Sequence, residues 1–290
     1  MDGIRFAIAL DVGGTSVKSG VVTMDSAVVE QRAQTAIDSG GSAESILATF
    51  AGIVQRHERR LPETSPKGLA LAFPGPFDYD AGVCRIRGVE KYESLFGVNV
   101  ADELRRRLGW GERPIRFRND AEAAIAGECL YGAGHGYDRV IGVTLGTGFG
   151  SAFMVNGAAQ TSGHGVPPNG WLYPYPAGDA RADDRFSVRG LERQLREAGG
   201  LPVDPEAAAE AAHGGASAGH DAFVAYGAAL GSFLAPFAVD FGADAVVVLG
   251  GIAGAFDLFG PSLRAALPTP ALPGTMGPDA ALLGAARSLA

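Results

Sequence analysis

The chain has 290 residues, enough for two domains of ordinary size, and 47% of them are hydrophobic, as in globular proteins with a sizeable core. Its net charge of −8 argues against nucleic acid as a partner, because binding to a phosphate backbone needs a basic surface. No apolar run is as long as a membrane span, so we expect no membrane partner. The two cysteines, Cys84 and Cys129, lack metal-ligand spacing and are expected to be reduced thiols. Since the first predicted strand begins almost at the N-terminus and leaves no room for a signal peptide, we expect a cytoplasmic protein.

The first feature in chain order is an apolar strand that ends in a glycine turn. Asp11 closes the strand, Gly13 and Gly14 form the turn, and Thr15 precedes a second apolar run. Adjacent glycines allow positive φ angles and close approach to an anion, so the turn can offer N–H groups, the Thr15 hydroxyl and Lys18 to a phosphate. Asp11 is placed to hold a metal ion through water.

Two further strands, over residues 16–23 and 27–35, make an antiparallel start, and a helix capped by Ser42 follows. A buried strand over residues 68–73 is then stopped by a rigid Pro-Gly-Pro turn centred on Gly75. Rigid turns at strand ends often line binding sites, which makes Gly75 a candidate site residue. Residues 77–98 are predicted to be irregular, with a short helix over residues 99–108.

The next strand, which begins at Ile115, delivers Asn119 and Asp120 to its carboxyl end. An alanine-rich helix follows over residues 121–131. Open α/β sheets bind their ligands at such strand ends, so both side chains are candidate site residues. A plain helix N-cap remains the alternative role for Asp120.

The second half of the chain opens with the same pattern, because a strand over residues 139–145 enters the turn Gly146-Thr147-Gly148 and a strand over 151–155 leaves it. Two such turns suggest a duplicated fold with phosphate held between the halves. A dinucleotide fold needs a helix after its glycine turn, and no P-loop pattern is present, so neither of those sites is supported.

A long loop rich in aromatic residues and proline is predicted over residues 160–185, and a loop of this length inside a compact domain is usually functional. Helices over residues 187–198 and 220–240 follow. A buried strand then enters a third glycine turn at Gly250 and Gly251, and a final helix begins near Pro278.

Six motifs in this order resemble the ROK family of sugar kinases, repressors and open reading frames: Asp11-Val-Gly-Gly-Thr-Ser-Val-Lys, Phe73-Pro-Gly-Pro, Asn119-Asp-Ala-Glu-Ala-Ala, Thr144-Leu-Gly-Thr-Gly-Phe-Gly, Leu249-Gly-Gly-Ile and Leu283-Gly-Ala-Ala. The resemblance implies an α/β, two-lobed actin/hexokinase-like (ribonuclease H-like) fold with mixed sheets. Residues 1–119 would form the N-terminal lobe and residues 120–290 the C-terminal lobe, with the final helix able to pack back on the first lobe. Enzymes of this family transfer the γ-phosphate of ATP to a sugar hydroxyl.

The resemblance also implies roles for single residues. It makes Asp120 the catalytic base and Mg²⁺ the metal, with Asp11 as the candidate residue that holds it through water. The sugar-binding residues would be Gly75, Asn119, Asp120, His164 and Asp183. The ATP-binding and phosphate-binding residues would be Asp11, Gly13, Gly14, Thr15, Lys18, Gly146, Thr147, Gly148, Gly250 and Gly251, the last two on the adenosine side.

The predicted loop departs from the family pattern. Enzymes of the family usually carry Gly-Glu-x-Gly-His followed by a cysteine cluster that holds zinc, but here Thr161 replaces the glutamate and no cysteine follows His164. We therefore expect no structural zinc. His164 then either reaches a sugar hydroxyl or is structural. Asp183 stands where the family has a second glutamate; Asp184 is the alternative, and both acids can equally be solvated loop residues.

These observations predict a cytoplasmic, Mg²⁺-dependent ATP:hexose 6-kinase for glucose or a close relative, assembled as a homodimer by resemblance. Two alternatives remain: a kinase of an N-acetylated or other sugar, and a non-catalytic sugar-responsive binding protein on the same fold. The sequence does not choose the sugar, nor does it decide between ATP and polyphosphate as the phosphoryl donor.

Overall fold

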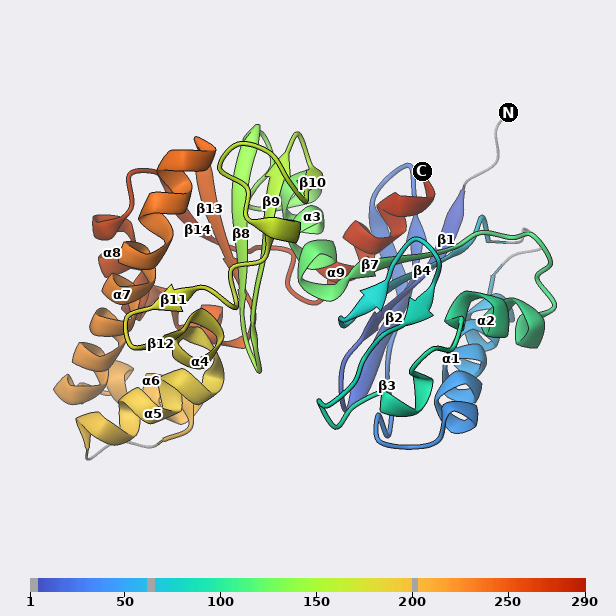
Figure 1. The fold of residues 1–290 in the computed structure, drawn as a ribbon, viewed down its shortest axis with the longest axis horizontal. Coiled ribbons are helices and arrows are strands. Elements are labelled where there is room, and N and C mark those ends of the chain that lie inside the picture. Colours follow the sequence, from blue (N-terminus) through green and yellow to red (C-terminus); the bar gives the residue numbers. More distant parts are fainter. Residues whose placement is uncertain (1–4, 62–65, 200–202) are drawn as a thin grey trace. The chain divides into compact units, whose positions relative to one another are not determined.

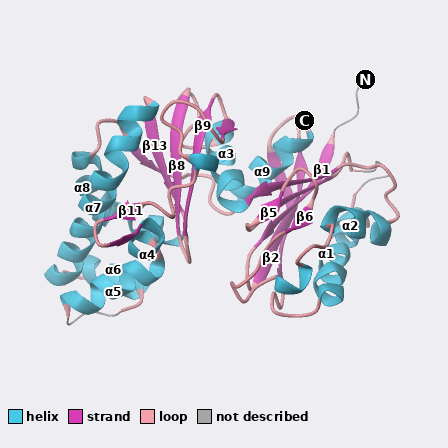
Figure 2. Ribbon diagram, viewed as in Figure 1, coloured by secondary structure: helices cyan, strands magenta, loops and turns pink. Residues whose placement is uncertain are grey.

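The computed structural model describes residues 5–61, 66–199 and 203–290. The chain divides into two compact units: residues 1–127 together with 278–290 form unit 1, and residues 128–277 form unit 2. Each unit has a sheet of its own with helices against it (Figures 1 and 2). The first passage between the units lies after Gly127, inside a helix, rather than at residue 119, where the sequence analysis ended the first lobe.

Unit 1 is built on a five-stranded mixed sheet in the order β3-β2-β1-β4-β7. Its first three strands are antiparallel, whereas β1, β4 and β7 run parallel. The strands are β1 (Phe6–Val12), β2 (Ser16–Thr23), β3 (Val28–Ala36), β4 (Leu69–Phe73) and β7 (Ile115–Asn119), and a small hairpin joins β5 (Phe77–Asp78) to β6 (Val83–Cys84). The helices are α1 (Ala43–Glu58), α2 (Val100–Leu108), α3 (Asp120–Tyr131) and α9 (Asp279–Ala286).

The core of unit 1 follows from the apolar pattern of its elements. All four residues from Ala7 to Leu10 in β1 are fully buried, because helices cover the sheet. The predicted apolar face of α1 is buried, and its predicted cap Ser42 accepts a hydrogen bond from the N–H of Ser45 at 3.3 Å. The final helix, α9, contacts β1 and β4. Residues 278–290 therefore complete the core of the unit that begins the chain.

Small residues let α9 approach α3 at backbone distance. A Cβ atom added to Gly284 would collide with the carbonyl of Ala123, and one added to Gly127 would collide with the carbonyl of Ala280. Only glycine fits at these two positions unless the helices separate.

Unit 2 repeats the plan with the strand order β10-β9-β8-β13-β14, in which β9 is antiparallel to β8 and both β8–β13 and β13–β14 are parallel. The strands are β8 (Arg139–Leu145), β9 (Phe149–Val155), β10 (Ala158–Gln160), β13 (Ala245–Leu249) and β14 (Ala271–Pro273). The helices are α4 (Ala182–Phe186), α5 (Val188–Ala198), α6 (Pro205–His213), α7 (Ser217–Phe241) and α8 (Phe256–Ala266). In both sheets an antiparallel pair enters and leaves a glycine turn, as the sequence predicted.

The segment read from sequence as one loop over residues 160–185 contains regular structure. It holds a hairpin of β11 (Pro176–Ala177) and β12 (Ala180–Arg181) and the start of α4. Two-residue strands are too short to show a hydrophobic period, which explains why the sequence did not reveal them.

Helix α7 is the one helix of the described residues that is long and apolar enough to cross a membrane by length and composition. In this structure it packs against α5, α6 and α8. Phe223, Leu230 and Leu234 are fully buried there, so α7 serves as a core helix of unit 2. Cys84 and Cys129 are both free and buried, as expected from the sequence.

Candidate functional site

The carboxyl ends of the parallel strands in unit 1 bring several predicted site residues together. Asp11 on β1 is paired in register with Ala72 on β4, and Phe73 at the end of β4 is paired with Asn119 at the end of β7. Gly75 follows β4, and Asp120 begins α3 directly after β7. Neighbouring parallel strands end at the same edge of a sheet, so these residues form one group in unit 1.

Asp120 is a partly buried carboxylate with a fixed orientation. Its Oδ1 accepts hydrogen bonds from the N–H of Ala121 at 2.9 Å and from Nδ2 of Asn119 at 3.0 Å. Burial raises the pKa of Asp120, while these hydrogen bonds and the positive charge of Lys91 act in the opposite direction. A carboxylate with a raised pKa is a better proton acceptor than an ordinary surface aspartate.

The cap of α3 is provided by Asn119, not by Asp120. Oδ1 of Asn119 accepts a hydrogen bond from the N–H of Glu122 at 3.1 Å, which is the usual pattern of an N-cap side chain. The plain N-cap role that the sequence left open for Asp120 is thereby filled by its neighbour. The hydrogen bonds from Ala121 and Asn119 both go to Oδ1 of Asp120, so Oδ2 is the oxygen better placed to meet a substrate.

Tyr79 belongs to the same group and was missed by the sequence analysis. Its hydroxyl accepts a hydrogen bond from Nδ2 of Asn119 at 3.2 Å and donates one to the carbonyl of Phe73 at 3.2 Å. A Cβ atom on Gly75 would lie 3.1 Å from this hydroxyl, which explains the preference for glycine there. Tyr79 lies in residues 77–98, where no periodic pattern marked any residue for function.

The first glycine turn lies at the end of β1, where Asp11 faces Lys18 across the antiparallel pair with 3.8 Å between Oδ2 and Nζ. The N–H of Gly13 donates to the carbonyl of Ser16 at 3.0 Å, and this bond closes the turn. Burial raises the pKa of Asp11, Lys18 lowers it, and the charge of Asp120 raises it further. The negative charges of Asp11 and Asp120 therefore repel each other within unit 1.

The second glycine turn is held by Asp183 in unit 2. Oδ1 of Asp183 accepts a hydrogen bond from the N–H of Phe149 at 2.8 Å, and Oδ2 accepts one from Arg189 at 2.9 Å. The N–H of Gly146 donates to the carbonyl of Gly148 at 3.1 Å, while Thr147 is exposed. Asp183 was predicted from sequence as a sugar-binding residue; here its Oδ1 contacts this turn, and its Oδ2 is paired with Arg189 on α5.

The third glycine turn lies against the second. Gly250 has a φ of 94°, and a Cβ atom added to it would collide with the backbone of Leu145, directly before Gly146. Gly251 has open space around it. Unit 2 therefore brings together the two turns that were predicted for phosphate and adenosine.

The remaining predicted residues of the 160–185 segment lie at the surface. His164, Thr161 and Asp184 are exposed. In the described ranges, no group of three or more His, Cys, Asp or Glu side chains could hold a metal ion. The water-mediated role of Asp11 toward Mg²⁺ needs no such group and stays a prediction.

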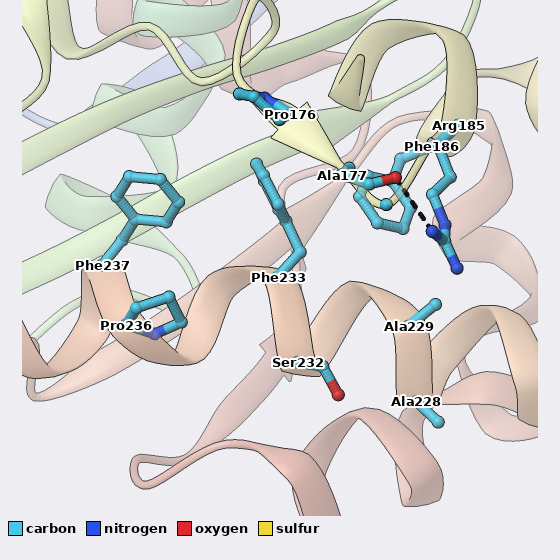
Figure 3. Close-up of a pocket in the computed structure, with 11 residues that line it drawn as sticks. Pro176, Ala177, Arg185, Phe186, Ala228, Ala229, Ser232, Phe233, Pro236 and Phe237 are labelled. Atoms are coloured by element: carbon cyan, nitrogen blue, oxygen red, sulfur yellow. Dashed lines mark hydrogen bonds between the residues drawn. The ribbon is translucent and has the colours of Figure 1, made fainter. Parts of the chain in front are cut away.

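A pocket of about 590 Å³ lies in unit 2 between α7 and the hairpin of β11 and β12 (Figure 3). Phe186, Phe233 and Phe237 line it, and Arg185 at its side donates a hydrogen bond to the carbonyl of Ala177 at 2.9 Å. None of the predicted site residues lines this pocket. The strand-end carboxylates and first glycine turn in unit 1, and the other two glycine turns in unit 2, remain the candidate site residues of their own units.

The chain is similar in sequence and in fold to known sugar kinases. A glucokinase from Thermotoga maritima is 28% identical over 159 residues, which are 55% of this chain and 47% of the glucokinase. The chain therefore spans about half the length of this curated relative. Among solved structures, the inorganic polyphosphate/ATP-glucomannokinase from Arthrobacter sp. strain KM is 27% identical, with a TM-score of 0.72 over 98% of both chains. The ROK family glucokinase from Streptomyces griseus, in complex with glucose and AMPPNP, is 24% identical, with a TM-score of 0.77 over 98% of both chains.

These structures confirm the predicted α/β, actin/hexokinase-like fold with mixed sheets. The sequence itself matches the ROK family over residues 7–288, which is nearly the whole chain. The glycine turns at the ends of β1 and β8 and the strand-end aspartate fall within that match. The chain therefore belongs to the ROK family.

Proposed function

We propose that this protein is a sugar kinase that transfers the γ-phosphate of ATP to a hexose hydroxyl, most simply the 6-hydroxyl of glucose. The observation that carries the proposal is Asp120, a carboxylate at a strand end with a raised pKa, whose hydrogen bonds from Ala121 and Asn119 both go to the same oxygen. A kinase needs a carboxylate of this kind to orient the hydroxyl and accept its proton.

The residues of unit 1 account for the sugar half of the reaction. Asn119, fixed by Tyr79 and by its cap on α3, orients Asp120, and Gly75 keeps the neighbouring space open. The sugar oxygen forms a bond to the γ-phosphorus while the bond from that phosphorus to ADP breaks. The hydroxyl proton passes to Asp120. Products are the sugar phosphate, ADP and one proton.

The glycine turns account for the phosphate half. The N–H groups of Gly13 and Gly146 close their turns, which leaves the backbone N–H groups at Gly14, Thr147 and Gly148 to suit the phosphates. The open space at Gly251 suits the adenosine side. Mg²⁺, held through water by Asp11, would neutralise phosphate charge when bound. Polyphosphate is the second candidate donor, favoured by the likeness to the polyphosphate/ATP-glucomannokinase.

Substrate choice depends on the loop that replaces the zinc segment of the family. Thr161 offers a short hydroxyl where a carboxylate would grip the sugar, so we expect glucose to be phosphorylated with tolerance for an epimer such as mannose. A site that hydrogen-bonds a hydroxyl can discriminate by up to ~10⁴-fold, and loss of one carboxylate reduces that difference. His164 is proposed as a remaining partner of the sugar.

The test is a screen of purified protein with glucose, mannose, galactose and N-acetylated hexosamines against ATP and polyphosphate. Phosphorylation of glucose supports the proposal. If only a 2-acetamido sugar reacts, the N-acetyl sugar kinase is correct; if a sugar binds but none reacts, the non-catalytic alternative is correct. Light scattering at micromolar concentration tests the proposed homodimer, and fractionation of the native host tests the proposed cytoplasmic location.

A further inference from the structure

We propose that Lys91, which the sequence analysis did not assign to the site, binds the phosphoryl group while it is transferred. This inference rests on the kinase function proposed above and adds a phosphate-binding residue to it. Three features of unit 1 support it: the place of Lys91, the rigidity of its loop, and the way this chain uses lysine.

Lys91 lies beside both the first glycine turn and the proposed base. Its Cδ lies 4.0 Å from the position that a Cβ atom would take on Gly14, so its stem passes next to the turn. Its positive charge acts on Asp120 and lowers the pKa of that carboxyl. Other titratable groups there are Asp11 with its partner Lys18, Tyr79, Tyr92 and Glu122. The charge of Asp120 raises the pKa of both Asp11 and Tyr79.

The residue after Lys91 anchors the loop to the glycine turn. Tyr92 is fully buried, and its hydroxyl donates a hydrogen bond to the carbonyl of Gly13 at 2.5 Å. Its N–H donates to the carbonyl of Ser39 at 2.6 Å. Lys91 is thereby held next to the turn by a direct contact between the loop and the turn.

The backbone on both sides of Lys91 is strained. Glu90 and Tyr92 each have a φ of 57°, a left-handed conformation that residues with a Cβ atom rarely adopt. The carboxylate of Glu93 stabilises this shape, because it accepts hydrogen bonds from the N–H groups of Val89 and Glu90 at 2.8 and 3.0 Å. Such strain is found where the surrounding structure fixes a residue for function.

Lysine is rare in this chain. Of the 24 lysine and arginine residues, only Lys18, Lys67 and Lys91 are lysines, and two of these lie at the first glycine turn. Lys18 is paired with Asp11, whereas no ion pair of Lys91 is found among the described residues. An ammonium group is a compact charge with three donors, which suits a phosphate oxygen.

The step assigned to Lys91 involves no bond to lysine. As the phosphorus passes from ADP to the sugar oxygen, negative charge is shared by the three non-bridging oxygens of the transferring group. Lys91 stays protonated and donates a hydrogen bond to one of these oxygens. Its charge also acts against the effect of burial on the pKa of Asp120 and so favours the ionised base.

Kinetics of Lys91→Met, Lys91→Arg and the control Lys67→Met test the assignment. We expect Lys91→Met to lower kcat about 100-fold, as for removal of one donor to a developing charge, and Lys91→Arg to recover part of the loss. The acid limb of kcat/KM should move to higher pH in Lys91→Met only. Retention of turnover within about threefold of wild type in Lys91→Met would overturn the inference.

A second measurement does not depend on turnover. Lysine acetylation by an N-hydroxysuccinimide ester, followed by peptide mass spectrometry, should be slowed at Lys91 by MgATP or by polyphosphate, and unchanged at Lys67. Equal labelling of Lys91 with and without both donors would contradict the proposal. If wild-type protein phosphorylates no sugar, the kinase proposal fails, and protection of Lys91 still decides whether it binds phosphate.

Discussion

The carboxylate of Asp183 accepts a hydrogen bond from the N–H of Phe149 at 2.8 Å and so joins the start of α4 to the second glycine turn. The same Oδ1 would lie 3.2 Å from a Cβ atom on Gly148. This contact favours a role of Asp183 in positioning the proposed phosphate-binding turn over the direct sugar contact expected from sequence.

Replacement of Asp183 by Ala should therefore loosen this turn. A hydrogen bond to a charged group contributes about 1.5–3 kcal/mol, so we expect the KM for the phosphoryl donor to rise tenfold or more, with a smaller change in the KM for sugar. The exposed neighbour provides the matched control, Asp184→Ala. A larger rise in the sugar KM than in the donor KM would instead establish the sugar contact.

Replacement of Asp120 by Asn should abolish most turnover without loss of the fold. The amide cannot accept the hydroxyl proton, and general-base catalysis contributes about 10²–10⁴-fold. Coupled assays of Asp120→Asn and of the exposed control Asp80→Asn measure this, with circular dichroism to check folding. Turnover of Asp120→Asn within about tenfold of wild type would exclude the proposed base.

The same substitution should raise stability at neutral pH. The native pKa of Asp120 lies above its ordinary value of 3.8, so the folded protein holds this proton where the unfolded chain has lost it. The contribution of Asp120 to stability is thus present below 3.8 and is lost as pH rises through the raised native pKa. We expect the Tm of Asp120→Asn to exceed that of wild type by an amount that grows as pH rises above 3.8 and becomes constant above the raised native pKa. A gap that shrinks as pH rises would contradict the sign of the shift.

Replacement of Glu128 by Ala should greatly lower the stability of unit 2. This fully buried carboxylate accepts hydrogen bonds from the N–H groups of Ala133 at 2.8 Å and Met276 at 2.7 Å. Glu128→Ala leaves both partly buried donors without this partner and opens a cavity where a fully buried side chain stood, which should lower the free energy of unfolding by about 3 kcal/mol. The exposed control on α5 is Glu197→Ala.

Tryptophan fluorescence can assign this loss to one unit. The chain has two tryptophans, Trp110 in unit 1 and Trp171 in unit 2, so a Trp110→Phe background reports on unit 2 alone. Urea unfolding of Glu128→Ala in this background should have a lower midpoint than that of the background itself. An unchanged midpoint would show that the buried carboxylate does not stabilise unit 2.

Untagged protein should contain no stoichiometric zinc, because a tetrahedral site needs about four nitrogen or sulfur ligands and the predicted loop offers only His164. The packing of its aromatic side chains, such as Trp171 against Tyr173 at 5.9 Å between ring centres, would order the loop instead. Elemental analysis showing about one zinc per chain would contradict this.

Local patterns predicted those parts of the fold and site that depend on neighbours in sequence. The alternation of apolar runs with glycine pairs located β1, β2, β8 and β9, and the strand before Asn119 located the proposed base. The helical spacing of apolar residues predicted the buried face of α1, and Ser42 directly before it predicted the N-cap.

The parts that sequence did not reveal depend on contacts between distant residues. Tyr92 reaches Gly13 across 79 positions, and Tyr79 reaches Asn119 across 40, from a segment without a period. The left-handed backbone at Glu90 and Tyr92 contradicts the local preference of those residues, so only the folded structure reveals it. Asp183 was selected by resemblance, but its hydrogen bond to Phe149 became visible only in three dimensions.

The packing of α9 on β1 and β4 sets an order for folding during synthesis. Domains usually fold as the ribosome releases them, the N-terminal one first. Here the unit that contains the N-terminal strand waits for residues 278–290, whereas residues 128–277 are continuous and are complete earlier. Nascent unit 1 therefore spends most of translation with the surface that α9 covers exposed, and this interval is where a chaperone would be needed most.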